Sequence, residues 1–394
     1  MVSKLALEGG SPVRTKREVM IYKIPLFDLN VGKEEEVAIL KTLRSKWISM
    51  GENVVSAEKK FANHLHIKHA VGVSSCTAAL HLALMVLGIK KGDEVIVPSL
   101  TFIATVNAVR YVGAIPVFAD IVSPEILNIN PLDIAAKITK KTKAIIAMHY
   151  GGFACDMDSI KRIAKKNNLY LVEDAAHAPD SQYKNQMLGT LGDIGCFSFY
   201  SNKNITCAEG GMLVTKNSTY NISARRLRSN GMSVLSYDCA KSHATDYDIC
   251  ELGYNYRMDD IRAGILLAQL NKLRSDVRKR QELRNYYIDK LSSVAEITIP
   301  YRRYPYRSSN YIFPVILNGM GTSKRNAIRQ KIGESGIQTS VHYPCVHRFS
   351  IYRGYKTNLK MTEYVSDNLI TLPLFYNLSY RQIDYIVKML KKVI

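Results

Sequence analysis

The sequence predicts an α/β protein in which a large domain, built on a mostly parallel β-sheet between helices, precedes a smaller C-terminal domain. Two observations lead to this prediction. From about residue 70 to residue 215, short β-rich runs alternate with stretches of helical periodicity. The strand runs are continuously apolar, which is typical of a parallel sheet covered by helices on both faces.

The predicted elements follow one another in order along this region. AVGV (70–73) predicts the first strand, and TAALHLALMVLG (77–88) predicts the helix after it. The next are the strand EVIVP (94–98), the helix TVNAVRYVG (105–113), the strands IPVFAD (115–120) and KAIIAMH (143–149), the helix SIKRIAKKN (159–167) and the strand LYLVED (169–174). In such sheets, ligands bind at the loops just beyond the carboxyl ends of the strands.

The rest of the chain divides into three further parts. Residues 1–30 are expected to form an irregular N-terminal arm before the large domain, 31–257. A long helical pattern at 258–291 connects that domain to the small C-terminal domain, 292–394. The final stretch, SYRQIDYIVKMLKKVI, predicts a helix that opens on a capping box, because Ser379 and Gln382 have the required spacing.

The composition is that of an ordinary globular protein, with 47% hydrophobic and 22% charged residues in a chain of 394. No apolar run approaches the roughly 20 residues that span a bilayer, and the N-terminal residues lack the apolar core of a signal peptide. The seven cysteines are scattered without a CxxC pair, which argues against a disulfide framework or a zinc site. We therefore expect a cytoplasmic protein that does not associate with membranes.

The net charge of +20 favours anionic partners, from nucleic acids to phosphorylated small molecules. The basic residues occur in short groups (140–143, 161–166, 225–228 and 274–280), and no nucleic-acid-binding motif accompanies them. We expect no nucleic-acid partner, because charge alone gives only nonspecific binding.

The stretch CFSFYSNKNITCAEGGMLVT (196–215) places a single lysine, Lys203, between two apolar runs that predict strands. An ammonium group is costly to bury without a partner. Lys203 therefore either points into solvent, without functional meaning, or is held in a pocket as an amine.

Three further positions follow or end predicted strands. Asp174 ends LYLVED, where its carboxylate either meets a ligand or caps a helix. The residues 75–77 (SCT) open a helix, whose N–H groups and dipole suit a phosphate, although serine and threonine also cap helices generally. Ser198 shares a strand face with Cys196 and Tyr200, and a buried serine bonded to the backbone is the alternative there.

Histidines occur in two places that deserve an interpretation. His64, His66 and His69 lie close together in HLHIKHA, but no neighbouring cysteine or carboxylate completes a metal site, so we expect no metal. His342 and Tyr343, before Pro344, either line a substrate cleft or belong to a packed loop.

Together these positions match the three parts of a pyridoxal phosphate (PLP) site. The parts are a lysine for the Schiff base, an aspartate for the pyridinium nitrogen and a helix N-terminus for the phosphate. Phe102, on the loop after EVIVP, is placed to lie against the cofactor ring. The sequence therefore predicts PLP as the cofactor.

Beyond these positions, nearly the whole chain resembles the DegT/DnrJ/EryC1/StrS group of sugar aminotransferases. The resemblance rests on long motifs in a fixed order: IPLFDLNVGKEEE, SKWISMGENV, SSCTAALHLALMVLGIKKGDEVIVPSLTFIATVNAV, VEDAAHA, LGDIGCFSFYSNKNITCAEGG, LGYNYRMDDIRAGILLAQL and HYP. It implies a fold type I PLP-dependent transferase, with a mostly parallel sheet between helices in the large domain and a smaller C-terminal α+β domain.

The resemblance also implies roles around the cofactor ring. Lys203 is expected to form the Schiff base and then to act as the general acid/base, and Asp174 is expected to hold the pyridinium nitrogen protonated. His177 matches the position that contacts the ring hydroxyl or its surroundings, and Phe102 is expected to stack on the ring. Dehydratase relatives carry histidine in place of this lysine, so transamination is preferred over deoxygenation.

For the cofactor phosphate, the resemblance implies Ser198 and the amides of Cys76 and Thr77. Asn255 in GYNYR matches an asparagine that reaches the phosphate from the neighbouring subunit, which implies a homodimer with shared sites. The family often has glycine at Cys76 and at Ala208. Both substitutes are small, so a close approach of the backbone should survive.

On this resemblance, we expect transfer of an amino group from L-glutamate to a keto group of a nucleotide-diphosphate-linked deoxy-keto-sugar. The candidate substrate contacts are Arg225, Arg226, Arg228, Arg257, His342 and Tyr343. Two alternatives stay open. One is glutamine-dependent amination of a keto-cyclitol, since the opening LALEGGSPVR resembles the start of such enzymes, and the other is a noncatalytic regulatory member that binds PLP.

Overall fold

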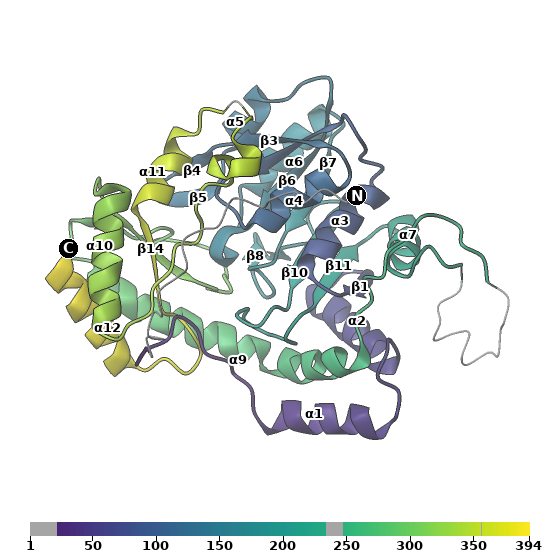
Figure 1. The fold of residues 1–394 in the computed structure, drawn as a ribbon, viewed down its shortest axis with the longest axis horizontal. Helices are drawn as coiled ribbons and strands as arrows, with labels where there is room; N and C mark the ends of the chain where they lie inside the picture. Colours follow the sequence, from purple (N-terminus) through teal and green to yellow (C-terminus); the bar gives the residue numbers. More distant parts are fainter. Residues whose placement is uncertain (1–21, 234–246, 356) are drawn as a thin grey trace, which may run out of the picture.

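The computed structural model describes residues 22–233, 247–355 and 357–394 (Figure 1). This part of the chain forms a large unit around a seven-stranded sheet and a small unit around a three-stranded sheet. The opening LALEGGSPVR, which suggested the keto-cyclitol alternative, lies outside the described residues.

The helices and strands of the large unit are α1 (Lys33–Arg44), α2 (Glu52–Leu65), β1 (His69–Val73), α3 (Cys76–Val86), β2 (Glu94–Pro98), α4 (Ile103–Tyr111), β3 (Ile115–Ala119), β4 (Ile121–Ser123), β5 (Ile126–Ile129), α5 (Pro131–Ala136), β6 (Thr142–Met148), η1 (Tyr150–Gly152), α6 (Met157–Lys166), β7 (Tyr170–Asp174), β8 (Gln182–Tyr183), β9 (Gln186–Met187), β10 (Ile194–Ser198), β11 (Gly211–Thr215) and α7 (Ser218–Arg228). The remaining elements are α9 (Asp260–Leu291), β12 (Ile297–Thr298), β13 (Phe313–Leu317), α10 (Gly321–Glu334), η2 (Val346–Arg348), η3 (Ser350–Tyr352), α11 (Lys360–Asn368), β14 (Leu369–Leu372) and α12 (Tyr380–Val393).

The central sheet has the order β1-β11-β10-β7-β6-β2-β3. β11 runs antiparallel to both of its neighbours, and the other neighbouring pairs are parallel. The prediction of a mostly parallel sheet is therefore confirmed. Asp174 is the last residue of β7 and lies opposite Met148 of β6 and Cys196 of β10, which places it at the carboxyl edge in the middle of the sheet.

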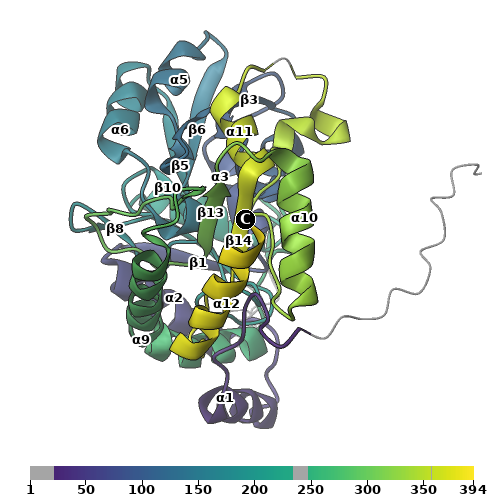
Figure 2. The same cartoon turned by 90° about the vertical axis from the view of Figure 1, so that its left-hand side faces the viewer.

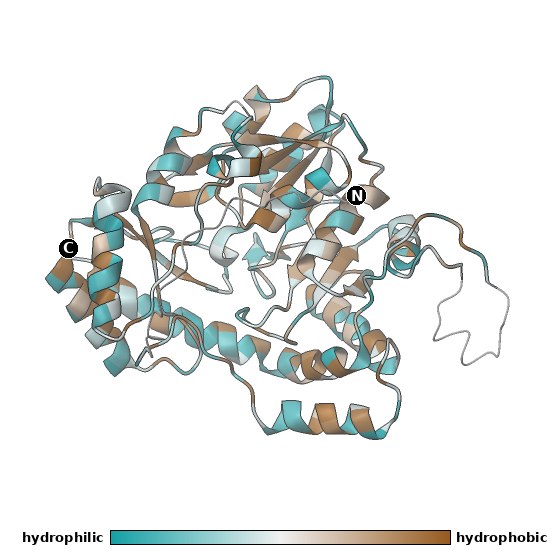
Figure 3. Cartoon of the chain, in the orientation of Figure 1, coloured by the Kyte–Doolittle hydropathy of each residue, from teal (hydrophilic) through white to brown (hydrophobic). Residues whose placement is uncertain are grey.

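Helices cover both faces of this sheet. Successive residues of a strand point to opposite faces, so each buried strand contributes side chains to two cores. In β6, Ile145 and Ala147 belong to a core that includes residues of α2, α6 and α9. Ala144 and Ile146 belong to a second core, formed with α3, α4 and α7. Figure 3 shows the resulting distribution, with brown strands between helices that are partly teal.

The small unit is an antiparallel sheet of order β12-β13-β14 with α10 and α12 beside it (Figure 2). Its core contains Phe313 and Ile370 from the strands, Ile332 from α10 and Ile386 from α12. α12 opens on the capping box that the sequence predicts, with reciprocal hydrogen bonds between Ser379 and Gln382.

The helix α9 joins the two units (Figure 1). Leu266 in its first half belongs to a core of the large unit, whereas Tyr287 near its end belongs to the core of the small unit. Its 32 residues, at 1.5 Å per residue, span about 48 Å. Within the described residues, no helix has both the length and the apolar character needed to cross a membrane.

Candidate active site

A cavity of about 400 Å³ lies at the carboxyl edge of the central sheet. Its walls come from the first turns of α3 and α4, the ends of β7 and β10 with the loops after them, and the small unit. The cavity brings together nine of the residues that the sequence singles out: Cys76, Thr77, Phe102, Asp174, His177, Ser198, Lys203, His342 and Tyr343.

Asp174 is almost completely buried, with 4% of its surface exposed. Its Oδ1 accepts a hydrogen bond from the backbone N–H of Ala176 (3.1 Å), and its Oδ2 accepts one from the hydroxyl of Thr105 (2.7 Å). Burial raises the pKa of Asp174, and these two hydrogen bonds and the nearby Lys203 amine oppose that rise. Turns rather than a helix follow Asp174, so the alternative of a helix cap does not apply.

Lys203 lies on the loop between β10 and β11, where its backbone N–H donates to the carbonyl of Tyr200 (2.9 Å). Its Nζ lies 4.1 Å from the centroid of the Tyr311 ring. Burial lowers the pKa of the Lys203 amine to about 8, although Cys76 and Asp174 act in the opposite direction. Of the two alternatives for Lys203, the structure therefore has the amine in a pocket.

The N-terminus of α3 forms one wall of the cavity. Ser75 caps it, since its Oγ accepts a hydrogen bond from the N–H of Ala78 (3.1 Å). The amides of Cys76 and Thr77 precede the first hydrogen bond within the helix, so their N–H groups are available to an anion. Gly211 packs against this turn, and a Cβ there would come within 2.4 Å of the carbonyl carbon of Ser75.

Ser198 ends β10 on the same side of the cavity, opposite Gly211 of β11. Its Oγ accepts a hydrogen bond from the N–H of Tyr200 (3.3 Å), which leaves the hydroxyl proton free to be donated. The loop that follows contains Ala208, whose φ of 69° lies in the left-handed region that favours glycine. Ala208 thus adopts a left-handed conformation, and this conformation accounts for the glycine that the family often has at this position.

A hydrogen-bonded chain fixes His177 and Tyr343. Nδ1 of His177 accepts from the backbone N–H of Gly151 (3.2 Å), so the neutral ring carries its proton on Nε2, which lies 3.0 Å from the Tyr343 hydroxyl. Burial lowers the pKa of His177 well below its usual range, with contributions from the charge of Lys203 and from His342. His177 is therefore a neutral donor, and the hydroxyl proton of Tyr343 remains available for another acceptor.

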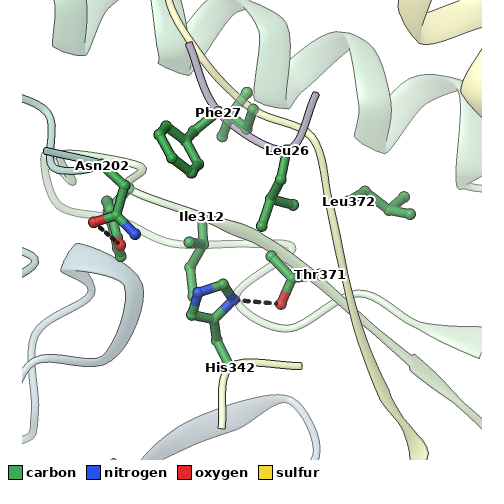
Figure 4. Close-up of a pocket in the computed structure, with 9 residues that line it drawn as sticks. Leu26, Phe27, Asn202, Ile312, His342, Thr371 and Leu372 are labelled. Atoms are coloured by element: carbon green, nitrogen blue, oxygen red, sulfur yellow. Dashed lines mark hydrogen bonds between the residues drawn. The ribbon is translucent and has the colours of Figure 1, made fainter. Parts of the chain in front are cut away.

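His342 lines both this cavity and a smaller pocket, and Figure 4 shows the smaller pocket. This pocket is lined by Leu26, Phe27, Asn202, Tyr311, Ile312, His342, Thr371, Leu372 and Leu374. Nδ1 of His342 lies 3.1 Å from Oγ1 of Thr371, and burial lowers the pKa of His342 to about 4. His342 and Tyr343 thus line the cavity, which supports the cleft interpretation over a packed loop.

Among the lining residues that the sequence did not single out, three contact other groups of the site. Thr105 binds Asp174, the Tyr311 ring lies under Lys203, and Asn202 accepts a hydrogen bond from the Tyr311 hydroxyl (3.0 Å). Thr105 follows Phe102 by three residues. A helix predicted to begin at residue 103 would have placed both residues in its first turn, beside the same ligand site. Tyr311 carries no comparable signal, because its position depends on how the small unit packs.

The arginines of α7 do not line the cavity. Arg228 is 1% exposed and donates to the carboxylate of Glu58 (2.6 Å) and to the carbonyl of Gly72 (2.7 Å). Arg225 donates to the same carboxylate at 2.8 Å, and Arg226 also lies off the cavity wall. A buried carboxylate thus engages both guanidinium groups, and within the described residues neither Arg225 nor Arg228 reaches the cavity of its own chain.

Asn255 and Arg257 lie outside the cavity wall of their own chain. Asn255 is exposed and pairs through its backbone with Ser229, while Arg257 pairs with Val73 at the end of β1. Nη1 of Arg257 is buried without a hydrogen-bond partner among the described residues. Neither residue is therefore placed to contact a molecule held in the cavity of its own chain.

The three histidines of HLHIKHA do not converge on a common point. His64 pairs with Asp180 (3.2 Å), His69 contacts the hydroxyl of Ser218 (3.0 Å), and His66 ends α2 in a left-handed conformation. Within residues 22–233, 247–355 and 357–394, no cluster of His, Cys, Asp and Glu is arranged to hold a metal ion.

The cavity fits pyridoxal phosphate. Its volume suits a molecule of that size, since ligand pockets run from about 300 to 1,000 Å³. The free amides of α3 suit a phosphate, the fixed carboxylate of Asp174 suits a protonated ring nitrogen, and the amine of Lys203 suits an aldehyde.

Comparisons with known sequences agree with this chemistry. A profile of the DegT/DnrJ/EryC1/StrS aminotransferase family matches residues 30–391. The chain is 36% identical over 389 residues to the spore coat polysaccharide biosynthesis protein SpsC of Bacillus subtilis, covering 97% of this chain and 99% of that protein. It is 37% identical over 369 residues to GDP-perosamine synthase of Escherichia coli O157:H7, covering 92% and 96%.

Solved structures show the same relationship. The PLP form of the putative sugar aminotransferase Spr1654 from Streptococcus pneumoniae matches with a TM-score of 0.89 and 30% identity, covering 94% of this chain and 98% of that one. PseC of Helicobacter pylori, an aminotransferase of pseudoaminic acid biosynthesis, matches with a TM-score of 0.86 and 28% identity, covering 92% and 96%. The chain therefore belongs to the DegT/DnrJ/EryC1/StrS aminotransferase family, as a PLP-dependent sugar aminotransferase of fold type I.

Proposed function

We propose that the enzyme transfers an amino group from L-glutamate to a keto group of a nucleotide-diphosphate-linked deoxy-keto-sugar, in the biosynthesis of amino sugars or polysaccharides. The observation that carries this proposal is the shared cavity. An amine with a pKa of about 8, a fixed carboxylate and a free helix N-terminus all line one space.

Bound there, PLP supplies an aldehyde that receives the amino group and a protonated ring that withdraws electrons from the reacting carbon. The Asp174 carboxylate would hold the proton on the ring nitrogen, because its two oxygens are already fixed by Thr105 and Ala176. The Lys203 amine would hold the cofactor in the resting enzyme and then move a proton at the amine-bearing carbon of the substrate. A pKa of about 8 leaves part of this amine uncharged near neutral pH.

The remaining lining residues would orient the cofactor. The N–H groups of Cys76 and Thr77 and the hydroxyl of Ser198 are the proposed phosphate donors. His177, held neutral with Nδ1 bound to Gly151 and Nε2 bound to Tyr343, would lie beside the ring hydroxyl of the cofactor. The Phe102 ring, about half exposed at the cavity, would lie against the cofactor ring.

The small unit would supply contacts to the sugar substrate. Tyr343 accepts a hydrogen bond from His177, so its own proton can be donated to a substrate oxygen. His342 beside it is neutral at physiological pH, because burial lowers its pKa to about 4. A neutral, polar wall of this kind suits the hydroxyl groups of a sugar.

We further propose that a second copy of the chain completes the site. Among the described residues that line the cavity, Lys203 is the only lysine or arginine, whereas the donor and a sugar nucleotide both carry negative charges. Asn255 is exposed and free to reach another subunit. The helix α1, which has a brown central band in Figure 3, leaves Val37, Leu40 and Leu43 each about half exposed, as expected of a surface that a partner covers.

Two observations support a nucleotide-linked sugar as the substrate. GDP-perosamine synthase, one of the similar proteins, is named for a nucleotide-linked amino sugar. The net charge of +20 favours a substrate that carries a pyrophosphate.

Two half-reactions test the proposal. The PLP-loaded protein is first mixed with L-glutamate, L-glutamine or L-alanine, and the loss of the cofactor's visible absorbance is followed. The amino-loaded protein is then offered a panel of nucleotide-linked 3-keto and 4-keto sugars and free keto-inositol. We expect glutamate to react fastest in the first step and a nucleotide-linked sugar to restore the absorbance in the second.

Other outcomes assign the function differently. Preference for glutamine together with free keto-inositol would support the keto-cyclitol alternative. Tight PLP binding without reaction with any donor would support a noncatalytic member. The test variant is Lys203→Ala, and the control is Lys216→Ala, which replaces an exposed lysine 13 residues further along the chain. Borohydride should trap the cofactor on the wild type and on Lys216→Ala, but not on Lys203→Ala.

A further inference from the structure

A chain of two hydroxyl groups runs behind the carboxylate of Asp174. Oγ1 of Thr105 lies 2.7 Å from Oδ2 of Asp174, and Oγ1 of Thr101 lies 2.7 Å from Oγ1 of Thr105. Thr101 and Thr105 are 1% and 0% exposed, so bulk solvent does not compete for either hydroxyl.

The direction of this chain follows from the number of protons. An ionised carboxylate can only accept hydrogen bonds, so the Thr105 hydroxyl must donate to Asp174. Its single proton is then used, and Thr105 must accept from Thr101. The proton of Thr101 therefore points to Thr105, and that of Thr105 points to Asp174.

This arrangement fixes the plane of the carboxylate. Thr105 holds Oδ2, and the backbone N–H of Ala176 holds Oδ1 at 3.1 Å. A carboxylate oxygen accepts more than one hydrogen bond, so each oxygen keeps capacity for a donor in the cavity.

The same turn of helix positions the cofactor-facing aromatic ring. Phe102 is the N-cap of α4, and the backbone N–H of Thr105 donates to the Phe102 carbonyl (3.2 Å). The distance between Phe102 and the hydroxyl that holds Asp174 is thereby set within one helical turn.

We propose that Thr105, supported by Thr101, is a positioning residue that keeps the Asp174 carboxylate ionised and aimed at the ring nitrogen of the cofactor. The inference rests on the proposed role of Asp174. Burial favours the neutral acid, and the Thr105 hydroxyl is the strongest of the groups that oppose this effect. Without that hydroxyl, the carboxyl group would lose a donor that stabilises its charge and one of the two hydrogen bonds that fix its plane.

The test measures equilibrium binding to the cofactor-free protein. The two ligands are PLP and an analogue in which a C–H group replaces the ring nitrogen. The variants are Thr105→Val, which is similar in size but has no hydroxyl, Thr105→Ser, which keeps the hydroxyl, and Asp174→Asn. Thr101→Val removes only the outer link and serves as a second variant if Thr105→Val does not fold.

We expect Thr105→Val to weaken PLP binding about tenfold, the usual loss for a hydrogen bond to a charged group, and to leave analogue binding within about twofold of the wild type. Thr105→Ser should restore PLP binding, and Thr101→Val should weaken it about two- to threefold, because it acts through one more hydrogen bond. The fall of activity on the acid side of the pH profile should also move to higher pH in Thr105→Val.

Equal weakening of both ligands by Thr105→Val, or an unchanged affinity for PLP, would overturn the inference and leave the proposed function intact. An unaltered affinity for PLP in Thr101→Val would do the same if Thr105→Val does not fold. If Asp174→Asn kept the wild-type preference for PLP over the analogue, the role of Asp174 in the proposed function would itself be wrong, and the inference would be overturned with it.

Discussion

Replacing Lys203 by methionine should stabilise the cofactor-free protein against unfolding. Burial lowers the pKa of the Lys203 amine from 10.5 to about 8, and each pH unit corresponds to about 1.4 kcal/mol. The charged amine therefore costs the folded state about 3 kcal/mol at pH 7. The side chain is only half-buried, and methionine also loses the contact with the Tyr311 ring, worth about 0.5–2 kcal/mol, so we expect a net gain of about 1–2 kcal/mol.

The pH dependence gives this prediction its sign. Between pH 8 and 10.5 the unfolded chain still holds the proton that the folded protein has released, so the stability of the wild type rises with pH in that window. Below pH 8 the full cost is present. The advantage of Lys203→Met should therefore be largest below pH 8 and should shrink as pH rises towards 10.5.

The assay is urea unfolding of cofactor-free wild type and Lys203→Met at several pH values from 7 to 10.5, followed by circular dichroism. Lys216→Met, at an exposed position, is the matched control and should change stability little at any pH. The reasoning would be refuted if Lys203→Met were less stable than the wild type at pH 7, or if the difference in stability did not depend on pH. Either result would mean that burial of the charged amine does not destabilise the folded protein.

Three further perturbations have distinct expected results. Asp174→Asn should still bind PLP, although more weakly than the wild type, and should slow the reaction with glutamate at least about a hundredfold, because the ring nitrogen is no longer held protonated. Absorbance measures both the cofactor content and the rate. Arg228→Met should destabilise the protein by about 1–3 kcal/mol, because the carbonyl of Gly72 and one oxygen of Glu58 lose a buried donor while Arg225 still pairs with Glu58. Thermal unfolding at matched pH checks this, and a loss below about 0.5 kcal/mol would contradict it. Gly211→Ala should weaken PLP binding while leaving the secondary structure intact, because its Cβ would meet the backbone of Ser75 at 2.4 Å and displace the first turn of α3. Equilibrium binding is compared with that of Gly354→Ala, where a Cβ would have open space and φ is not in the left-handed region, which separates this clash from a general effect.

The sequence was sufficient to predict the sheet and the residues at its carboxyl edge. Asp174 and Ser198 end buried apolar strands, and the helix that starts at Cys76 follows another, so the known geometry of parallel sheets brings them together without knowledge of tertiary packing. The short strands β4, β5, β8 and β9 were not predicted, because runs of two to four residues carry too little periodicity to be recognised.

Contacts between distant segments could not be predicted in this way. Arg225 and Arg228 look like an exposed basic group on a helix, yet both bind Glu58, which lies 167 and 170 residues away in the sequence. Tyr311 reaches Lys203 only because the small unit packs over the cavity. Thr105 falls in a predicted helix, but the pattern does not say that its hydroxyl turns towards Asp174.

The continuity of α9 bears on how the protein can unfold and be divided. One uninterrupted helix contributes Leu266 to one hydrophobic core and Tyr287 to another, so melting of either core frays the helix that the other depends on. We therefore expect a single cooperative thermal transition for the two units. No cut between residues 260 and 291 would yield two autonomous fragments, because each such cut leaves one core without part of its own helix.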